Sequence, residues 1–571
     1  MKKRLIATFL VFVLLLGAVG CGKTNPPNEG ASNSPTPDNA ATSTPVQQAE
    51  PKKVTFYPIN AGLQSGPASG WVDEFLRENG IILEVIPYSD EKTQAMLASG
   101  DLPDVVTFNN NPTNAQAALE AGMLLPLDEH LDKLPNIVND DLYAPGLKYS
   151  REYFSNDTGN LYVLPFGVGG TSTAVAADTD RYAIKLKYDV YEQIGAPAFD
   201  KLEDVIPVLK KMQEAYPKNA DGSNVWGMTL FSDFDTNYFY NMLSVFSTIG
   251  YSVDYLKYGI EYDGVANEGY SIFRDGSVYK RAAKFFYEMN QAGLLDPDSL
   301  TQTRDTANKK MSSKAAVAGW AAAPGWESQG YYPISFGEFM PCYNYSNAYG
   351  RIGIAVSAKA ENVDASLKLV DMLADPEALL TLYNGPQGER WDIVDNKLVL
   401  TEKYKEHRDK ADGSKFLLSN GEEYALYNFG VYVRGTGNII EKYNEVYVAD
   451  LWKETLDYNY SKDTAKAWAA RYGYNYLKEQ LEAEDRLKAI LDPYFPIFLS
   501  PDSDDLKLTL AAFKDVIIPG TWELAYAKDD AEFEKLWETL KNKCETLGIQ
   551  QIIDYKLDDI AKAKETAKQF K

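Results

Sequence analysis

The stretch that most constrains the fold is AMLASGDLPDVVTFNNN, residues 95–111. It predicts the end of an amphipathic helix, a turn at 100–103, and a short buried strand over 105–108 that runs into polar residues. Glycine can leave a helix at positive φ and proline cannot continue one, so Gly100 and Pro103 give the turn a physical basis. A helix followed by a buried strand is the repeating unit of α/β folds.

Two earlier strands extend this unit. Residues 53–59 and 81–86 are expected to be strands, and Ser69 can cap a helix between them that Gly80 ends. The resulting β-α-β-α-β order predicts a parallel sheet, and ligands of such sheets bind beyond the carboxyl ends of the strands. The candidate ligand contacts that follow these strands are Asn60, Phe108, Asn109, Asn110 and Asn111. The alternative for the three consecutive asparagines is that they simply form a turn.

The N-terminus has the pattern of a secreted, lipid-anchored protein. Residues 1–20 have a basic head and an apolar run over 9–16 that is too short to span a bilayer, which predicts a signal peptide. The order GAVGC, ending at Cys21, looks like a bacterial lipobox, in which the cysteine is acylated. The alternative is an ordinary signal peptide with an incidental cysteine. Acyl chains, at about 0.8 kcal/mol per buried CH₂, would hold the protein at the extracellular face of the cell membrane.

Residues 21–52 are expected to be a disordered tether. They are rich in Asn, Pro, Ser, Thr and Ala, and cannot bury enough apolar surface to offset the entropy of ordering. About 520 residues follow the tether, too many for one hydrophobic core. The sequence therefore predicts at least two domains.

Charge and motif content exclude several classes of function. The chain has 57 Lys and Arg against 81 Asp and Glu, which argues against a nucleic-acid partner. It has two histidines, His130 and His407, and contains no HExxH, CxxC, Walker, GxSxG or dinucleotide-binding motif. We therefore expect no catalytic residues and no cofactor. A glycosidase pair of carboxylates stays open as an alternative, because only the separation of the two in space defines it.

Several motifs resemble those of the extracellular solute-binding lipoproteins of ABC importers, particularly the long sugar-type family of Gram-positive bacteria. These motifs are SGDLPDVV at 99–106, GNLYVLP at 159–165, YEMNQAGLLDP at 287–297, GPQGERW at 385–391, and IIPG at 517–520 with Trp537 and LGI at 547–549. The hairpin before Leu161 departs from the family pattern at Asn156, where relatives have Asp. An amide makes the same turn contact as that carboxylate.

The resemblance implies a two-lobe α/β fold of the periplasmic-binding-protein type, with hinge crossings and a helical C-terminal region. It implies that lobe one comprises 53–173 and 335–400, and that lobe two comprises 174–334 and, mainly, 401–571. The glycine-rich run 167–170 suits a hinge crossing.

The resemblance also adds aromatic ligand contacts, namely Trp226, Trp320, Trp326 and Trp391. Trp320 and Trp326 end the segment KAAVAGWAAAPGW, whose small residues let backbones approach closely. Flat aromatic faces suit stacking on sugar rings, and the alternative is that these tryptophans belong to the core.

The implied function is a membrane-anchored receptor that captures a saccharide or oligosaccharide between its lobes and delivers it to an ABC permease. We expect a monomer. The alternatives are a secreted glycan-active hydrolase and a peptide-binding receptor. Relatives often carry an acidic Ca²⁺ loop, but the segment 219–224 here lacks the downstream acid pair, so no bound metal is predicted. Cys544 lies on an apolar helix face, which favours a packed thiol over a disulfide with Cys342.

Overall fold

The computed structural model describes most of the chain after residue 49. The described residues are 50–58, 65–108, 112–169, 183–232, 246–319, 330–344, 351–410, 414–425, 433–435, 437–459, 461–491 and 494–570. The predicted signal peptide, Cys21 and residues 21–49 of the predicted tether lie outside them. Within these ranges, no helix has both the length and the apolar character needed to cross a membrane.

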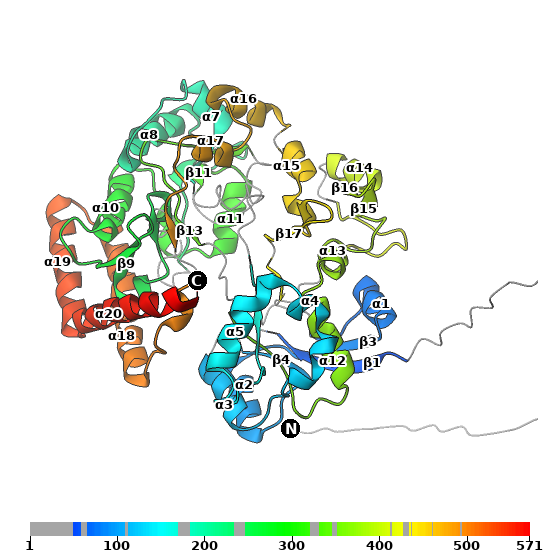
Figure 1. Ribbon diagram of the computed structural model, residues 1–571. Helices are drawn as coiled ribbons and strands as arrows, with labels where there is room; N and C mark the ends of the chain where they lie inside the picture. The colour runs from blue at the N-terminus through cyan, green and yellow to red at the C-terminus, as the bar shows by residue number, and fades with distance from the viewer. Residues whose placement is uncertain are drawn as a thin grey trace, which may run out of the picture. The chain divides into compact units, whose positions relative to one another are not determined.

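The first lobe is built on a six-stranded sheet with the order β2-β3-β1-β4-β14-β5 (Figure 1). Its strands are β1 Lys52–Tyr57, β2 Gly66–Pro67, β3 Ile81–Val85, β4 Val105–Thr107, β5 Leu164–Phe166 and β14 Arg351–Val356. Strand β1 pairs in parallel with β3 and β4, as the β-α-β-α-β pattern predicted. Strand β14 pairs antiparallel with both β4 and β5, so β5 runs in the same direction as β4, and β2 adds an antiparallel edge to β3.

The helices of the first lobe begin and end where their local sequence dictates. The Ser89 side chain caps α2 by accepting a hydrogen bond from the Lys92 backbone N–H at 3.1 Å, and Gly100 ends the helix at φ 71°. The predicted turn at 100–103 is therefore confirmed. The helices and small hairpins of this lobe are α1 Gly70–Glu78, α2 Asp90–Ser99, α3 Pro112–Glu120, α4 Pro135–Val138, α5 Ala144–Tyr153, α12 Val363–Met372, α13 Pro376–Asn384, α14 Glu402–Lys410, β15 Trp391–Val394, β16 Lys397–Leu400, β17 Ile439–Ile440 and β18 Glu445–Val446.

The first lobe extends further along the chain than expected. One continuous hydrophobic core runs from Val54 to Trp452 and includes Tyr447. Residues up to Trp452 therefore pack with lobe one, whereas we expected 401–571 to belong mainly to lobe two. The other boundary also moves, because residues as far as Cys342 pack in the second lobe and the chain re-enters the first sheet at β14. Hydrophobic periodicity marks a buried face without showing which core buries it, and this explains both differences.

The second lobe contains a four-stranded sheet, β12-β6-β11-β7, and a three-stranded sheet, β10-β9-β8. In the larger sheet β11 runs parallel to β7 and antiparallel to β6. The strands are β6 Lys185–Lys187, β7 Trp226–Met228, β8 Tyr251–Ser252, β9 Ile260–Asp263, β10 Glu268–Ser271, β11 Ala316–Gly319 and β12 Tyr331–Pro333, with β13 Tyr343–Asn344 pairing in parallel with β19 Ile490–Leu491. Helices α7 Tyr188–Gln193, α8 Val205–Ala215, α10 Val278–Gln291 and α11 Arg304–Ser312 belong to this lobe.

The C-terminal helices complete the second lobe (Figure 1). After α15 Lys453–Asn459 come α16 Asp463–Tyr472, α17 Leu477–Ala483, the one-turn helix η9 Pro496–Phe498, α18 Asp504–Ala525, α19 Asp530–Thr546 and α20 Ile549–Ala567. Helix α19 buries Phe533, Trp537, Leu540 and Cys544, which confirms that Cys544 lies on an apolar helix face. Helix α18 lies against α10, and the hydroxyls of Tyr279 and Thr521 are 2.6 Å apart in a hydrogen bond.

Both described cysteines that follow the tether are buried free thiols. The side chains of Cys342 and Cys544 are 4% and 0% exposed. The structure therefore confirms packed thiols rather than a disulfide. Burial raises the pKa of each thiol to about 12.

Where the chain leaves the first lobe, Val168 is hydrogen-bonded to the segment 433–435. The Val168 N–H donates to the Val433 carbonyl at 2.9 Å, and the Gly435 N–H donates to the Val168 carbonyl at 2.8 Å. Gly169 has φ 92°, and a β-carbon there would lie 2.4 Å from the Asn438 side chain, so only glycine fits. Residues 170–182 lie outside the described ranges, and the chain is next described at Ala183 in the core of the second lobe. The predicted hinge crossing at 167–170 therefore runs into residues outside the described ranges and stays a prediction.

The second lobe also contacts the first through η9. The Tyr149 hydroxyl of α5 donates to the Ile497 carbonyl at 3.0 Å. The ring centroids of Tyr149 and Tyr153 lie 5.5 and 5.9 Å from that of Phe498. The segment around η9 thereby packs against the core face of the first lobe that includes Phe108 and Val163.

A buried carboxylate joins two helices of the first lobe and makes stability depend on pH. Asp371 of α12 is 8% exposed and accepts hydrogen bonds from the backbone and side-chain N–H groups of Asn136 at 2.9 and 2.7 Å. Burial, with a smaller contribution from Asp375, raises the pKa of Asp371 from 3.8 to about 6. Between these values the native state binds the proton more tightly than the unfolded state.

We therefore expect Asp371 to lower the free energy of unfolding as the pH rises from about 4 to about 6, by at most about 3 kcal/mol. Below this window the full stability is present, and above it no further loss occurs. Urea unfolding of the wild type and of Asp371→Asn between pH 4 and 8 measures the effect. The free energy of unfolding of the wild type minus that of Asp371→Asn should fall across the window and be constant above about pH 7. A difference that is constant over the whole range would contradict the assignment.

Candidate functional site

The first candidate surface lies where β1 and β4 end. Phe108, which follows β4, is 1% exposed and packs with Tyr57 and Val106. Its N–H donates to the Gly353 carbonyl at 2.9 Å. Gly353 has φ 141°, and a β-carbon there would lie 3.0 Å from the Phe108 nitrogen. The structure thus places Phe108 at the predicted edge of the sheet, with its side chain in the core.

Two tyrosines at the same edge were not predicted from the sequence. Tyr57, the last residue of β1, donates from its hydroxyl to the Ser89 carbonyl at 2.8 Å and accepts from the Ser89 N–H at 3.1 Å. Tyr88 is half-buried, its ring centroid is 5.5 Å from that of Tyr57, and its hydroxyl donates to Asp90 at 2.5 Å. The sequence could have indicated Tyr88 as a candidate, because Tyr88 lies three residues after the end of β3. This edge therefore carries an aromatic and a carboxylate side by side.

Polar amides flank these tyrosines. The Gln94 side chain of α2 donates to the Asn114 side chain of α3 at 3.1 Å, and Asn114 is 8% exposed. Helix α3 begins at Pro112, immediately after the predicted contacts Asn109, Asn110 and Asn111. Those asparagines lie outside the described residues, as does Asn60.

The second candidate surface lies where the parallel strands β7 and β11 end. Strand β7 ends at Met228, the chain continues through 229–232, and β11 ends at Gly319. Gly319 pairs with Lys185 of β6, and Lys185 is only 7% exposed. The predicted contacts Trp320 and Trp326, which follow Gly319, lie outside the described residues. Their contact with ligand stays a prediction.

The other two predicted tryptophans are described, and neither lies at a carboxyl edge. Trp226 is half-buried and is the first residue of β7, where its N–H donates to the Ala315 carbonyl at 2.9 Å. It therefore lies at the amino end of the strand. Trp391 is 2% exposed in the core of the first lobe, where its indole N–H donates to the Gly385 carbonyl at 2.8 Å. Trp391 therefore belongs to the core of the first lobe, whereas contact of Trp226 with ligand stays a prediction.

Metal ligation has no support in the described part of the chain. Across those ranges, no group of three or more His, Cys, Asp or Glu side chains is arranged to hold a metal ion. In the loop at 219–224, the Lys218 ammonium donates to the Asn224 side chain at 2.6 Å, and the Ser223 N–H donates to Asp221 at 2.9 Å.

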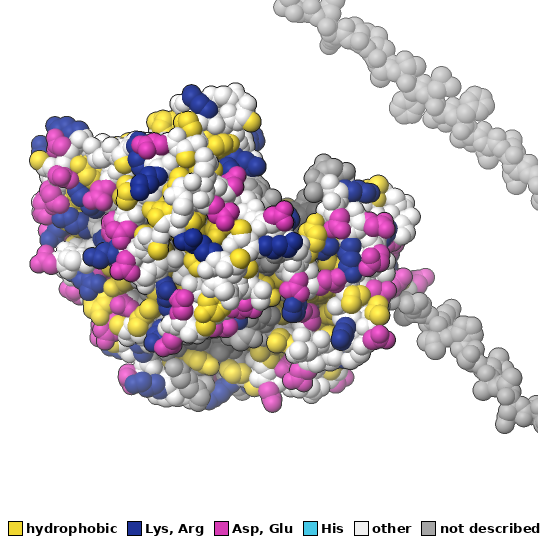
Figure 2. All heavy atoms as spheres, turned by 90° about the horizontal axis from the view of Figure 1, so that it is seen from above, with side chains coloured by type: hydrophobic (Ala, Val, Ile, Leu, Met, Phe, Trp, Pro, Cys, Tyr) yellow, Lys and Arg dark blue, Asp and Glu magenta, His cyan; other side chains and the backbone are white. Residues whose placement is uncertain are grey.

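Surface charge is mixed. On the face shown in Figure 2, Lys and Arg side chains are interspersed with Asp and Glu, and hydrophobic side chains lie between them. That face carries no continuous basic surface of the kind that binds nucleic acid. The picture agrees with the acidic balance of the sequence.

Comparisons with known proteins give a family model and a set of solved structures. Residues 70–406 match the model of the family described as bacterial extracellular solute-binding protein. The structure is similar to the ABC-transporter substrate-binding protein FusA of S. pneumoniae in complex with kestose, with 16% identity, a TM-score of 0.58, and coverage of 90% of this chain and 100% of that one.

Two further solved structures are similar over comparable lengths. The first is an HMO-binding, ABC-transporter-associated solute-binding protein of Bifidobacterium longum infantis ATCC 15697, with 18% identity, a TM-score of 0.54, and coverage of 90% and 99%. The second is the N-glycan transport solute-binding protein NgtS of Streptococcus pneumoniae, with 15% identity, a TM-score of 0.51, and coverage of 90% and 99%. These similarities show the two-lobe fold. A comparison with curated protein sequences found no match.

Proposed function

Because the chain belongs to the bacterial extracellular solute-binding proteins, we propose that it is the receptor of an ABC importer and that it captures a saccharide or oligosaccharide. The observation that carries the proposal is the two-lobe fold, in which parallel strands of both lobes end in described aromatic and polar residues. Tyr88 and Asp90 follow β3 in one lobe, and Phe231 and Ser232 follow β7 in the other. Ligands of α/β sheets bind at such edges.

The chemistry of these edges suits a sugar. An aromatic face packs on the apolar face of a pyranose or furanose ring, and carboxylate, amide and hydroxyl groups exchange hydrogen bonds with its hydroxyls. Of the three similar structures, one is an HMO-binding protein, one is in complex with kestose and one is an N-glycan transport protein. We extend the saccharide class, and no particular sugar, to this chain.

The receptor would act by closing its lobes on the ligand. Closure requires contacts that are stronger in the closed state than in the open state, and ligand bridging the two edges supplies them. The closed form would then dock on the permease. No bond is broken in this cycle, so we propose a binding protein rather than an enzyme.

Attachment to the membrane would come from the N-terminus. An acylated Cys21 and the tether that follows it would hold a monomeric receptor at the extracellular face near its permease. Mass spectrometry of the N-terminal peptide of the protein from its own cells tests this proposal. An unmodified Cys21 in that peptide would count against the anchor.

A thermal-shift screen tests the function. The chain is heated with kestose, an N-glycan oligosaccharide, a uronate oligosaccharide and, as a comparison, a mixed tripeptide. A saccharide at 100 times its Kd should stabilise the native state by about 2.7 kcal/mol and raise the melting temperature. A response to the peptide alone would favour the peptide receptor, and no response to any saccharide would count against the proposal.

Chromatography of the ligand after binding separates the receptor from the hydrolase. A receptor returns the saccharide intact. A glycan-active hydrolase returns shorter products, and its two carboxylates would lie about 5–10 Å apart.

A further inference from the structure

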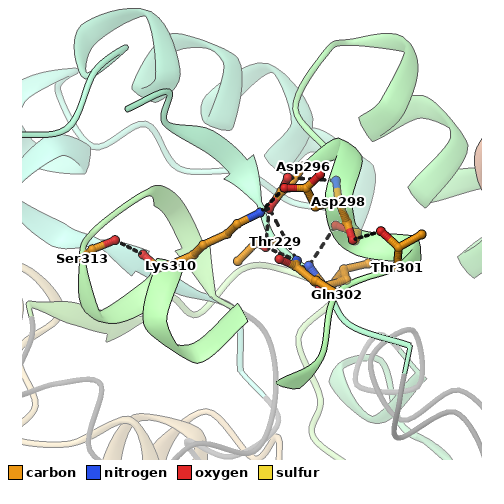
Figure 3. Close-up of polar contacts among 9 residues, drawn as sticks. Thr229, Asp296, Asp298, Thr301, Gln302, Lys310 and Ser313 are labelled. Atoms are coloured by element: carbon orange, nitrogen blue, oxygen red, sulfur yellow. Dashed lines mark hydrogen bonds and ion pairs between the residues drawn. The ribbon is translucent and has the colours of Figure 1, made fainter. Parts of the chain in front are cut away.

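A buried polar cluster holds the residues that extend β7 in the second lobe (Figure 3). Asp296 is its centre and is 1% exposed. The Thr229 hydroxyl and the Lys310 ammonium each donate to Asp296 Oδ2 at 2.7 Å. Lys310 also donates to Asp298 at 2.7 Å, and the Gln302 amide donates to the Thr229 hydroxyl at 2.7 Å. We call these five residues the Asp296 cluster.

The same cluster replaces the regular hydrogen bonding of a strand beyond Met228. The Asp296 N–H donates to the Met228 carbonyl at 2.9 Å. Beyond Met228, side chains form the hydrogen bonds that hold this segment. The Leu230 N–H donates to the Ser299 hydroxyl at 3.0 Å, and the Ser232 hydroxyl donates to the Leu300 carbonyl at 2.7 Å. The Gln302 amide also donates to the Leu230 carbonyl. The position of 229–232 therefore depends on side chains of 296–302.

Stability alone does not explain this arrangement. Asp296 is buried, whereas its partner Lys310 is 24% exposed. Because the buried carboxylate loses its hydration, pairing it with a cation stabilises a fold no better than apolar packing of the same volume. The cluster is also incompletely paired, since the buried Gln302 Oε1 has no hydrogen-bond partner within the described part of the chain. What such directional bonds supply is a fixed geometry for the backbone they hold.

The segment they hold lies at the carboxyl edge of β7. We propose that Asp296 is a positioning residue for ligand binding, and that it acts by fixing 229–232, with Phe231 and Ser232, at the edge where the saccharide binds. This inference rests on the proposed function for the location of the ligand. Asp296 itself is buried beneath the edge and acts through Thr229.

A second buried carboxylate in the same lobe provides a matched control. Glu261 of β9 is 0% exposed. It accepts from the Arg274 guanidinium at 2.7 Å, from the Ser277 hydroxyl at 3.1 Å and from the Tyr279 N–H at 3.0 Å. Asp296 likewise accepts from one cation, one hydroxyl and one backbone N–H, the last from Asp298 at 3.1 Å. Glu261 belongs to the three-stranded sheet, and the hydrogen-bond partners of its carboxylate in the described part of the chain are Arg274, Ser277 and Tyr279.

The experiment compares Asp296→Asn with Glu261→Gln in the full chain. Melting temperature measures the structural loss, which should be similar in both. Isothermal titration with kestose, the N-glycan oligosaccharide and the uronate oligosaccharide measures binding. We expect Asp296→Asn to raise the Kd of the saccharide that the wild type binds by about tenfold or more, because a site loosened by a fraction of an ångström loses its contacts. Glu261→Gln should change that Kd by less than about twofold, because distant sites that share no partners couple only weakly.

Thr229→Val is the second variant, which keeps the volume of the side chain and removes two hydrogen bonds, the one donated to Asp296 and the one accepted from Gln302. It should fold and should weaken binding in the same direction as Asp296→Asn. Equal changes in Kd for Asp296→Asn and Glu261→Gln would overturn the positioning role. A Kd that is unchanged in both single variants, Thr229→Val and Asp296→Asn, would overturn it as well.

Failure of the proposed function is recognised separately. If the wild type binds none of the three saccharides, the proposed ligand class is wrong, and hydrogen exchange still decides the positioning role. Amides of 228–232 should exchange faster in Asp296→Asn than in Glu261→Gln. Equal exchange rates there would overturn the inference whatever the ligand.

Discussion

Trp452→Ala is expected to destabilise the first lobe by about 3–5 kcal/mol and to leave the second lobe protected. Trp452 is 1% exposed, its indole N–H donates to the Val446 carbonyl at 2.7 Å, and it packs edge-on against Trp391. Truncation removes this packing and leaves a cavity in the core that includes β1 and β3. Hydrogen exchange with mass spectrometry should show faster exchange in β1, β3 and α13.

Trp468→Ala is the matched control, 16 positions further along the chain. Trp468 is also 1% exposed and donates to a backbone carbonyl, that of Pro333, at 2.7 Å. It packs in the core of the second lobe. We expect a similar loss of stability, with faster exchange in β6 and β12 instead. If both variants loosened the same lobe, the boundary between 452 and 468 would be wrong.

Lys556→Met is expected to cost about 3–5 kcal/mol, because it removes the counter-charge of the buried Asp559 and leaves Asp502 with only the more distant Lys257 at 3.9 Å. Lys556 of α20 is 1% exposed. Its ammonium contacts Asp502 at 2.9 Å, Asp559 at 3.2 Å and the Ser500 carbonyl at 3.1 Å. Asp559 is itself 5% exposed, so its charge cannot turn to water. The urea-unfolding midpoint at pH 7 measures the loss.

Two further variants make the test of Lys556 specific. Adding Asp559→Asn to Lys556→Met removes one of the stranded charges and should recover part of the stability. Lys562→Met, on the same helix, removes an exposed partner of Asp558 and should leave the midpoint unchanged. Ser500 and Asp502 follow η9, so the loss of Lys556 should also speed exchange in η9. A double variant no more stable than Lys556→Met would contradict this electrostatic explanation.

The local elements of the fold were predictable because their signals are local. The parallel order of β1, β3 and β4 follows from apolar runs separated by a helix, and Gly100 placed the turn. Helix α19 follows from apolar residues at steps of three and four. The lobe that takes 401–452 was not predictable, because assignment to a core depends on contacts distant in sequence.

Helix α18 shows that tertiary contacts can also override a local sequence signal. Pro519 lies inside a 22-residue helix, although proline ends most helices because it lacks an N–H and crowds the preceding turn. Next to it, a β-carbon at Gly520 would lie 2.4 Å from Leu540 of α19. Close packing of α18 on α19 therefore keeps the helix continuous where local preference alone would break it. Tertiary packing of this kind leaves no periodic mark in the sequence.

The sequence predicted the strand ends of the first lobe, and binding of ligand there stays a prediction. The rule that ligands bind beyond strand ends pointed to the edge that carries Tyr88, yet Tyr88 was not named from the sequence, and the edge that carries Phe231 was not predicted. Phe108 and Trp391 were named and are buried in cores. Aromatic side chains satisfy the same patterns in a core and in a binding surface, and only the arrangement of neighbouring strands separates the two.

The two buried thiols make the receptor suited to single-site labelling. A maleimide reacts with the thiolate, and burial keeps Cys342 and Cys544 protonated at neutral pH because their pKa values are raised to about 12. Once Cys21 is acylated or replaced by serine, a cysteine introduced on the surface of either lobe becomes the fast-reacting position of the chain. A dye pair placed in this way, one on each lobe, would report domain closure in real time without removing a native side chain from either core.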